Sequence, residues 1–170
     1  MWSRRSILVL GPALLAGCGF RPMYAERADG GGAVAGLRQV RVARILERNG
    51  QLMRRRLEER LATNEATARY DLRVGLAFGA EVQGFTRDGT PTRVRYTGTA
   101  TWFLFDTNTP PRLVARGAER TFDAFNVPDN QFFAAETARL AMEQRLVDQL
   151  AEDIVRSLSV RFESGPPQAG

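Results

Sequence analysis

Two long stretches of alternating apolar and polar residues lie in the middle of the chain, joined by a short turn. From Leu72 to Val82 every second residue is apolar, so these side chains share one face of a strand. The same alternation resumes from Val94 to Leu104. A period of two is typical of strands with one buried face. The turn between them contains an Asp-Gly pair, which is a strong hairpin signal. The sequence therefore predicts a long antiparallel hairpin with one apolar face.

Two further segments have the pattern of strands. Residues 113–125 follow a turn with two prolines and continue the alternation, which slips near Gly117 and so indicates a β-bulge there. Residues 37–47 carry Val and Ile among arginines and predict a short strand with one charged face. The three sequential strands from the first alternating stretch onward form an antiparallel meander, with an apolar face opposite a face of Arg, Thr and Gly.

Two segments have apolar residues at helical spacing. Residues 51–62 carry three of them four apart, and residues 129–159 carry a longer stripe that Asp129 can cap. An open apolar sheet face needs a partner layer, so we expect both helices to cover it. The predicted fold class is α+β: a two-layer sandwich with a four-stranded, mostly antiparallel sheet and two helices packed on one face, in the order β-α-β-β-β-α.

The N-terminus has the features of an export signal. Two arginines precede an apolar run from Ile7 to Ala16, which is shorter than the roughly 20 residues that a membrane-spanning helix needs. The small residues that follow end on Cys18, the only cysteine of the chain. This pattern resembles a lipobox, in which a diacylglycerol is attached to the Cys18 sulfur, the chain is cut before it, and the new N-terminus is acylated. An ordinary buried cysteine is the alternative.

This interpretation divides the chain into four parts. Residues 1–17 are expected to be a lipoprotein signal peptide, exported by either the Sec or the twin-arginine route. Residues 18–36 contain a glycine run and are expected to be a lipidated flexible leader. Residues 37–162 form a single α+β domain, and residues 163–170 are expected to be a disordered tail. Two or more acyl chains would anchor the mature protein stably in a membrane.

The composition argues against an enzyme. The chain has no histidine and one cysteine, which excludes Ser-His-Asp and Cys-His sites and any His-ligated metal. Carboxylate pairs such as Glu58 and Glu59 are adjacent in a predicted helix, where neighbours point in different directions, so a solvated face is their simpler interpretation. We expect no catalytic residue, no metal site, and no cofactor other than the diacylglycerol and N-acyl chain on Cys18.

Positive charge is concentrated in the first part of the mature chain. Residues 18–120 hold 18 arginines against 11 acidic residues, a net charge of +7, whereas residues 121–170 hold 4 against 8, a net charge of −4. The planar donor fork of arginine suits bidentate binding of phosphate. In an exported, membrane-tethered protein this favours a lipid head group over nucleic acid, for which the chain carries no recognition motif.

These features together resemble a known family. The lipobox is followed at once by the heptapeptide Cys-Gly-Phe-Arg-Pro-Met-Tyr from Cys18 to Tyr24, and the closing helix contains Ala-Ala-Glu-Thr-Ala-Arg-Leu at residues 134–140. With the order of elements, this is similar to the LPS-assembly lipoprotein family, LptE, in its alphaproteobacterial form. The resemblance implies an outer-membrane, periplasm-facing subunit of the lipopolysaccharide translocon. Such a subunit plugs a large β-barrel partner, assists its assembly, and binds lipopolysaccharide for insertion at the cell surface.

The candidate lipopolysaccharide-binding residues lie at and beside the hairpin turn. Arg87 belongs to the turn, and Arg93 and Arg95 follow it on the polar face of the next strand. The alternative function is that of a generic periplasmic scaffold lipoprotein, which would recruit a soluble partner through its sheet edge.

Overall fold

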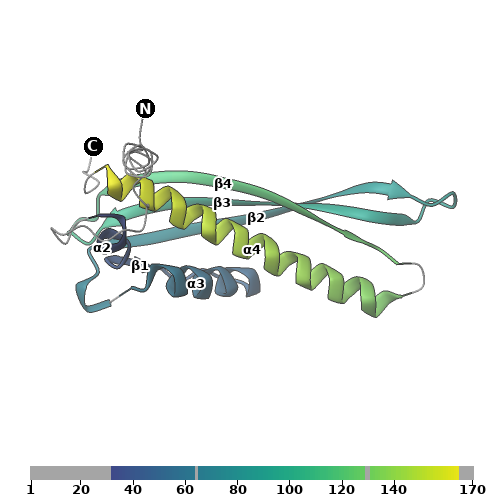
Figure 1. Cartoon of the computed structure of the whole chain (residues 1–170), viewed down its shortest axis with the longest axis horizontal. Helices are drawn as coiled ribbons and strands as arrows, with labels where there is room; N and C mark the ends of the chain where they lie inside the picture. The colour runs from purple at the N-terminus through teal and green to yellow at the C-terminus, as the bar shows by residue number, and fades with distance from the viewer. Residues whose placement is uncertain (1–31, 64, 129–130, 165–170) are drawn as a thin grey trace, which may run out of the picture.

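The computed structural model describes residues 32–63, 65–128 and 131–164. They form a four-stranded sheet with helices on one face (Figure 1). In chain order the elements are α2 (Ala33–Leu37), β1 (Val40–Val42), α3 (Arg48–Leu61), the 3-10 helix η1 (Glu65–Thr67), β2 (Tyr70–Phe85), β3 (Pro91–Asp106), β4 (Leu113–Asn126) and α4 (Phe132–Glu163).

The strands lie in the sheet in sequence order, β1-β2-β3-β4. β1 is parallel to β2, and the other two pairs are antiparallel. The β2–β3 ladder is regular from Tyr70 to Val82 and irregular between Val82 and Phe85, near the turn. The predicted α+β sandwich, its element order and its hairpin are confirmed, with α2 as an additional short helix.

The core lies between the inner face of the sheet and the helices α3 and α4. The apolar residues that the alternation placed on one side of β2 and β3 provide the sheet's share of this core. Helix α4 contributes residues at helical spacing, because its long apolar stripe faces the sheet. The fully buried side chains include Leu72, Ala100, Trp102 and Leu104 from the sheet, Met53, Leu57 and Leu61 from α3, and Leu146, Leu150, Ile154 and Leu158 from α4.

The β-bulge predicted at Gly117 is wrong. Gly117 pairs regularly with Trp102, and the register shift of β4 lies between Leu113 and Ala115 instead. A Cβ atom at residue 117 would lie 2.5 Å from the Trp102 indole. Glycine is therefore needed for the close approach of the indole ring, whose Nε1 donates to Glu119 at 3.3 Å.

The start of the domain also differs from the prediction. Helix α2 occupies the last residues of the stretch 18–36, so the expectation of a flexible leader is wrong for those residues. Ala33 and Leu37 are buried, and the Ala33 backbone N–H donates to Glu163 Oε1 at 3.1 Å. Glu163 is accordingly the last residue of α4 and not part of a disordered tail.

The strand predicted over residues 37–47 is reduced to the three residues of β1. Ile45 is still buried, but it reaches the core from a loop. The N-cap of α4 is Gln131. The predicted cap Asp129 lies outside the described residues, as do Cys18 and the tail after residue 164.

Candidate lipid-binding surface

The outer face of the sheet, opposite the helices, carries most of the strand arginines. The register of the ladders places alternate residues on this face, and many of them are exposed. Its acidic residues are Asp71 and Glu81, both on β2. Its arginines are Arg41 from β1, Arg73 from β2, Arg93 and Arg95 from β3, and Arg116 and Arg120 from β4.

Strand β3 brings two of the predicted residues together. Arg93 and Arg95 lie two residues apart on the outer face. The Arg93 side chain leans toward β4, and the Arg95 guanidinium lies between Phe122 of β4 and the Gln83 side chain of β2, whose amide oxygen accepts from it at 3.0 Å. The Arg93 guanidinium donates to Asn126 Oδ1 at 2.9 Å, and the Arg95 guanidinium lies 5.3 Å from the centroid of the Phe122 ring. Neither arginine forms an ion pair with a described residue. Their positive charge is therefore available to an anion.

The third predicted residue, Arg87, lies apart from this pair. It belongs to the exposed turn beyond Phe85 and Pro91, the last paired residues of the hairpin. The structure therefore groups Arg93 and Arg95 on the sheet face and leaves Arg87 on the tip.

The turn itself is held by Asp88. The Thr86 hydroxyl donates to its carboxylate, and the Thr90 backbone N–H donates to it at 3.3 Å. These hydrogen bonds, that from Thr86 first, lower the pKa of Asp88. Gly89 adopts a φ of 87°, a conformation that favours glycine. Asp88 therefore stabilises the turn as a carboxylate.

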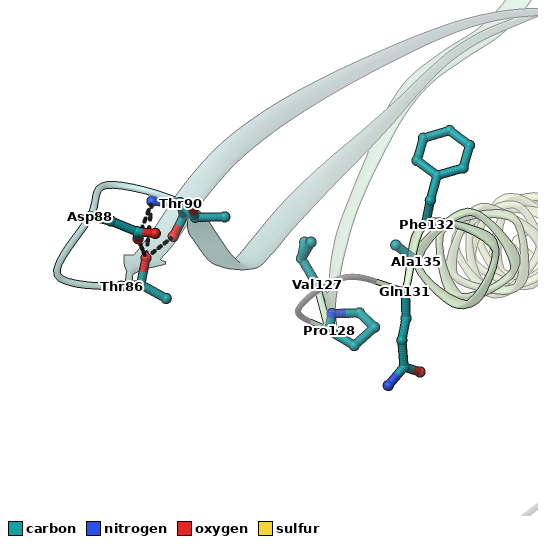
Figure 2. A pocket seen from close by; sticks show the side chains of 8 residues that line it. All are labelled: Thr86, Asp88, Thr90, Val127, Pro128, Gln131, Phe132 and Ala135. Carbon is teal, nitrogen blue, oxygen red and sulfur yellow. Dashed lines mark hydrogen bonds between the residues drawn. The ribbon is translucent and has the colours of Figure 1, made fainter.

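A cleft of about 580 Å³ separates this turn from the start of α4 (Figure 2). The turn side consists of polar residues, and the opposite side carries Val127, Pro128 and Phe132. Phe132 is 78% exposed, and its neighbour Phe133 is 86% exposed. The distal end of the molecule thus combines exposed arginines with exposed aromatic rings.

Comparison with known proteins assigns the family. Residues 37–158 match the model of the lipopolysaccharide-assembly family LptE. The chain belongs to this family. It is therefore a lipopolysaccharide-assembly lipoprotein, and the resemblance drawn from the sequence is confirmed. Among curated proteins, none matches the chain.

Solved lipoprotein structures share the fold. A lipoprotein from Caulobacter crescentus is 22% identical, with 79% of this chain and 97% of that chain covered and a TM-score of 0.64. The rare lipoprotein B from Shewanella oneidensis is 10% identical, with 72% of this chain and 93% of that chain covered and a TM-score of 0.55. A minor lipoprotein from Acinetobacter baumannii is 15% identical, with 72% of this chain and 89% of that chain covered and a TM-score of 0.52.

Sequence reasoning missed what β4 adds to the surface of this family member. Arg120 and Phe122 lie on the same outer face as Arg95, and Asn126 holds Arg93. The signal was the even spacing of Arg116, Arg120 and Phe122 along the strand. This spacing alone does not show which β3 residues lie beside these side chains, because that depends on the register between β3 and β4.

In the part of the chain that the structure describes, no three His, Cys, Asp or Glu side chains gather where they could hold a metal ion. None of the helices in that part has the length and apolar character to cross a bilayer.

Proposed function

We propose that this chain is a non-enzymatic outer-membrane lipoprotein that plugs the β-barrel of the lipopolysaccharide translocon and assists its assembly. Acyl chains on Cys18 hold it at the membrane, facing the periplasm. The family match over residues 37–158 carries this proposal, because it spans the domain from just before β1 to the last turns of α4. A single domain with one helix-covered face and one open sheet face suits a plug.

In this proposal the outer face binds the phosphate groups of lipopolysaccharide. Arg93 and Arg95 present two guanidinium groups side by side, and their contacts with Asn126 and Phe122 are to uncharged groups. Such contacts orient the donor forks without neutralising them. Arg87 extends the positive surface to the hairpin tip.

Co-purification from detergent-solubilised outer membranes tests the translocon role. We expect a stoichiometric complex with a β-barrel of much larger mass. A soluble periplasmic partner in place of the barrel would support the scaffold alternative. In the same cells, Cys18→Ser should release a folded domain from the membrane, and a loss of fold would contradict the proposed role of Cys18 as an anchor only.

Binding of purified lipopolysaccharide tests the surface. The triple variant Arg87→Gln, Arg93→Gln, Arg95→Gln should bind severalfold more weakly at low salt than the unchanged protein, since paired arginines supply charge-assisted hydrogen bonds to phosphate. The control is Arg60→Gln, Arg156→Gln, which removes two exposed charges from the helices. An equal loss in the control, or unchanged affinity in the triple variant, would exclude these residues as the site.

A further inference from the structure

One edge of the sheet has no strand neighbour over most of its length. β1 pairs only with Tyr70–Leu72 of β2. Ala43 N–H then donates to the Leu72 carbonyl at 2.9 Å, and the chain leaves the sheet. The loop that follows is separated from Val74–Phe78 by a cleft of about 310 Å³. From residue 73 onward β2 is therefore an open edge.

The backbone groups on this edge can be assigned. The Leu72 carbonyl points toward β1, and the N–H and C=O of alternate strand residues point to the same side. The backbone groups of Val74, Leu76, Phe78 and Ala80 therefore point to the open edge. A strand laid beside β2 would find a row of donors and acceptors there.

The opposite edge of the sheet shows what this one lacks. β4 carries charged residues along its length, has a register shift near its start, and has the Arg116 carbonyl bonded to Arg161 Nη2 at 3.0 Å. Charges and irregularities are the usual protection of an edge strand against pairing. Residues 74–80 of β2 read Val-Gly-Leu-Ala-Phe-Gly-Ala, without a charge or a proline.

An antiparallel pairing centred on Ala77 uses nearly the whole open edge. That edge begins at Arg73, where β1 has ended, and its regular part ends at Val82, before the irregular ladder near the turn. An antiparallel pair of two such edges centred on Ala77 places Val74 opposite Ala80 and Leu76 opposite Phe78. These are the residues whose backbone groups face the edge, so this register joins donors to acceptors.

The same register pairs opposite charges. It sets Arg73 of one copy opposite Glu81 of the other, on the outer face, and two-fold symmetry repeats the pair. Glu81 forms no ion pair with a described residue, because Arg95 across the ladder packs on Phe122. Arg73 contacts Asp71 at 3.3 Å and lies 4.4 Å from the centroid of the Phe105 ring of β3, and 53% of its side chain is exposed. To meet Glu81 of the second copy, this exposed guanidinium has to turn from Phe105 toward the open edge.

We propose that two copies of this chain pair through Arg73–Glu81 of β2, joining their sheets into one continuous sheet. The partner is a second copy because backbone polarity, apolar side chains and charge match in a single self-complementary register. Opposite charges directly across a ladder stabilise the pairing of strands. This homodimer is a state of the protein outside its complex with a barrel, and it does not depend on lipid binding.

Disulfide cross-linking tests the register. In the full chain carrying Cys18→Ser, Ala77→Cys introduces the only thiol at the two-fold axis. There the Cα atoms of a non-hydrogen-bonded pair lie about 4.5 Å apart, within the range for a disulfide. We expect a cross-linked dimer that increases with protein concentration. The control Ala118→Cys places an exposed thiol on β4. Equal or slower cross-linking at residue 77 would overturn the proposal.

Charge reversal tests the partner independently. Glu81→Arg and Arg73→Glu should each lower the association constant of the dimer about tenfold, since each change turns the two attractive Arg73–Glu81 pairs into repulsive pairs. The double reversal should restore it. Circular dichroism verifies that each variant is folded, and Glu81→Arg alone suffices if Arg73→Glu is unstable. Failure of the double reversal to restore dimers would overturn this register.

Discussion

The two ends of the β2–β3 hairpin share one alternating pattern but have different surroundings. Near β1, Leu72, Trp102 and Leu104 are fully buried beneath the helices. Near the turn, Val82 is 39% exposed and Phe85 is 64% exposed. Figure 1 shows the reason, since the hairpin tip extends away from α4. A strand's pattern fixes which side chains share a face, whereas the helices decide how much of that face is covered.

If the proposed lipid-binding surface is correct, this difference separates the residues that stabilise the fold from those that bind lipid. The covered end holds the core residues that resist unfolding. The uncovered end holds Arg87, Arg93, Arg95 and the exposed rings of α4, whose replacement should cost the fold little. Variants at the two ends should therefore fall into two classes.

The largest expected effect is on the covered end. Trp102→Ala should lower the free energy of unfolding by about 3 to 5 kcal/mol, because it leaves a cavity between β3, β4 and α4. Urea unfolding followed by circular dichroism measures it. Phe132→Ala at the uncovered end should change the same quantity by about 0.5 kcal/mol or less. Similar losses in the two variants would show that the uncovered end is part of the core.

A matched pair of glycines gives the next largest effect. Gly117→Ala should destabilise by about 1 to 3 kcal/mol, because the added methyl group would lie 2.5 Å from the Trp102 indole. Gly79→Ala is the control, since a Cβ there meets no atom within 4 Å. Both are strand residues and both gain one methyl group. Equal unfolding midpoints would contradict the role assigned to Gly117.

The arginine pair should affect binding and leave stability nearly unchanged. Arg93→Gln, Arg95→Gln should alter the free energy of unfolding by about 0.5 kcal/mol or less, since both side chains lie on an open face. Lipopolysaccharide affinity, measured on the same samples, should fall severalfold. A large loss of stability would mean that their contacts with Asn126 and Phe122 hold β4 in place.

The smallest expected effect concerns the turn. The pKa of Asp88 is lower in the folded protein than in the unfolded chain, where it is about 3.9. The stabilisation of the turn by the carboxylate is therefore complete above about pH 3.9 and is lost as the pH falls through the lower pKa of the folded state. The protection of the Thr90 amide against hydrogen exchange, measured relative to its intrinsic rate at each pH, should therefore fall at acidic pH. Asp88→Asn should remove this pH dependence, and its persistence in that variant would assign it to another group.

Much of the fold could be predicted because its signals are local. The period of two in β2 and β3, the Asp-Gly turn and the helical spacing in α4 each depend on residues close in the chain. The arrangement of the candidate surface could be predicted in part: Arg93 and Arg95 share a face because they are two residues apart. Phe122 and Asn126 could not be assigned to them, since that neighbourhood depends on the register with β4.

The sequence by itself determined the order of elements, the faces of the strands and the family. Tertiary structure decided where those faces are covered, why residue 117 is glycine, and which edge of the sheet stays open. Each of these depends on segments far apart in the chain. A Cβ at Gly36 of α2, for example, would lie 2.5 Å from the Phe162 ring of α4. Local patterns specify on which face of a strand or helix a side chain lies, but its burial depends on the elements that pack against that face.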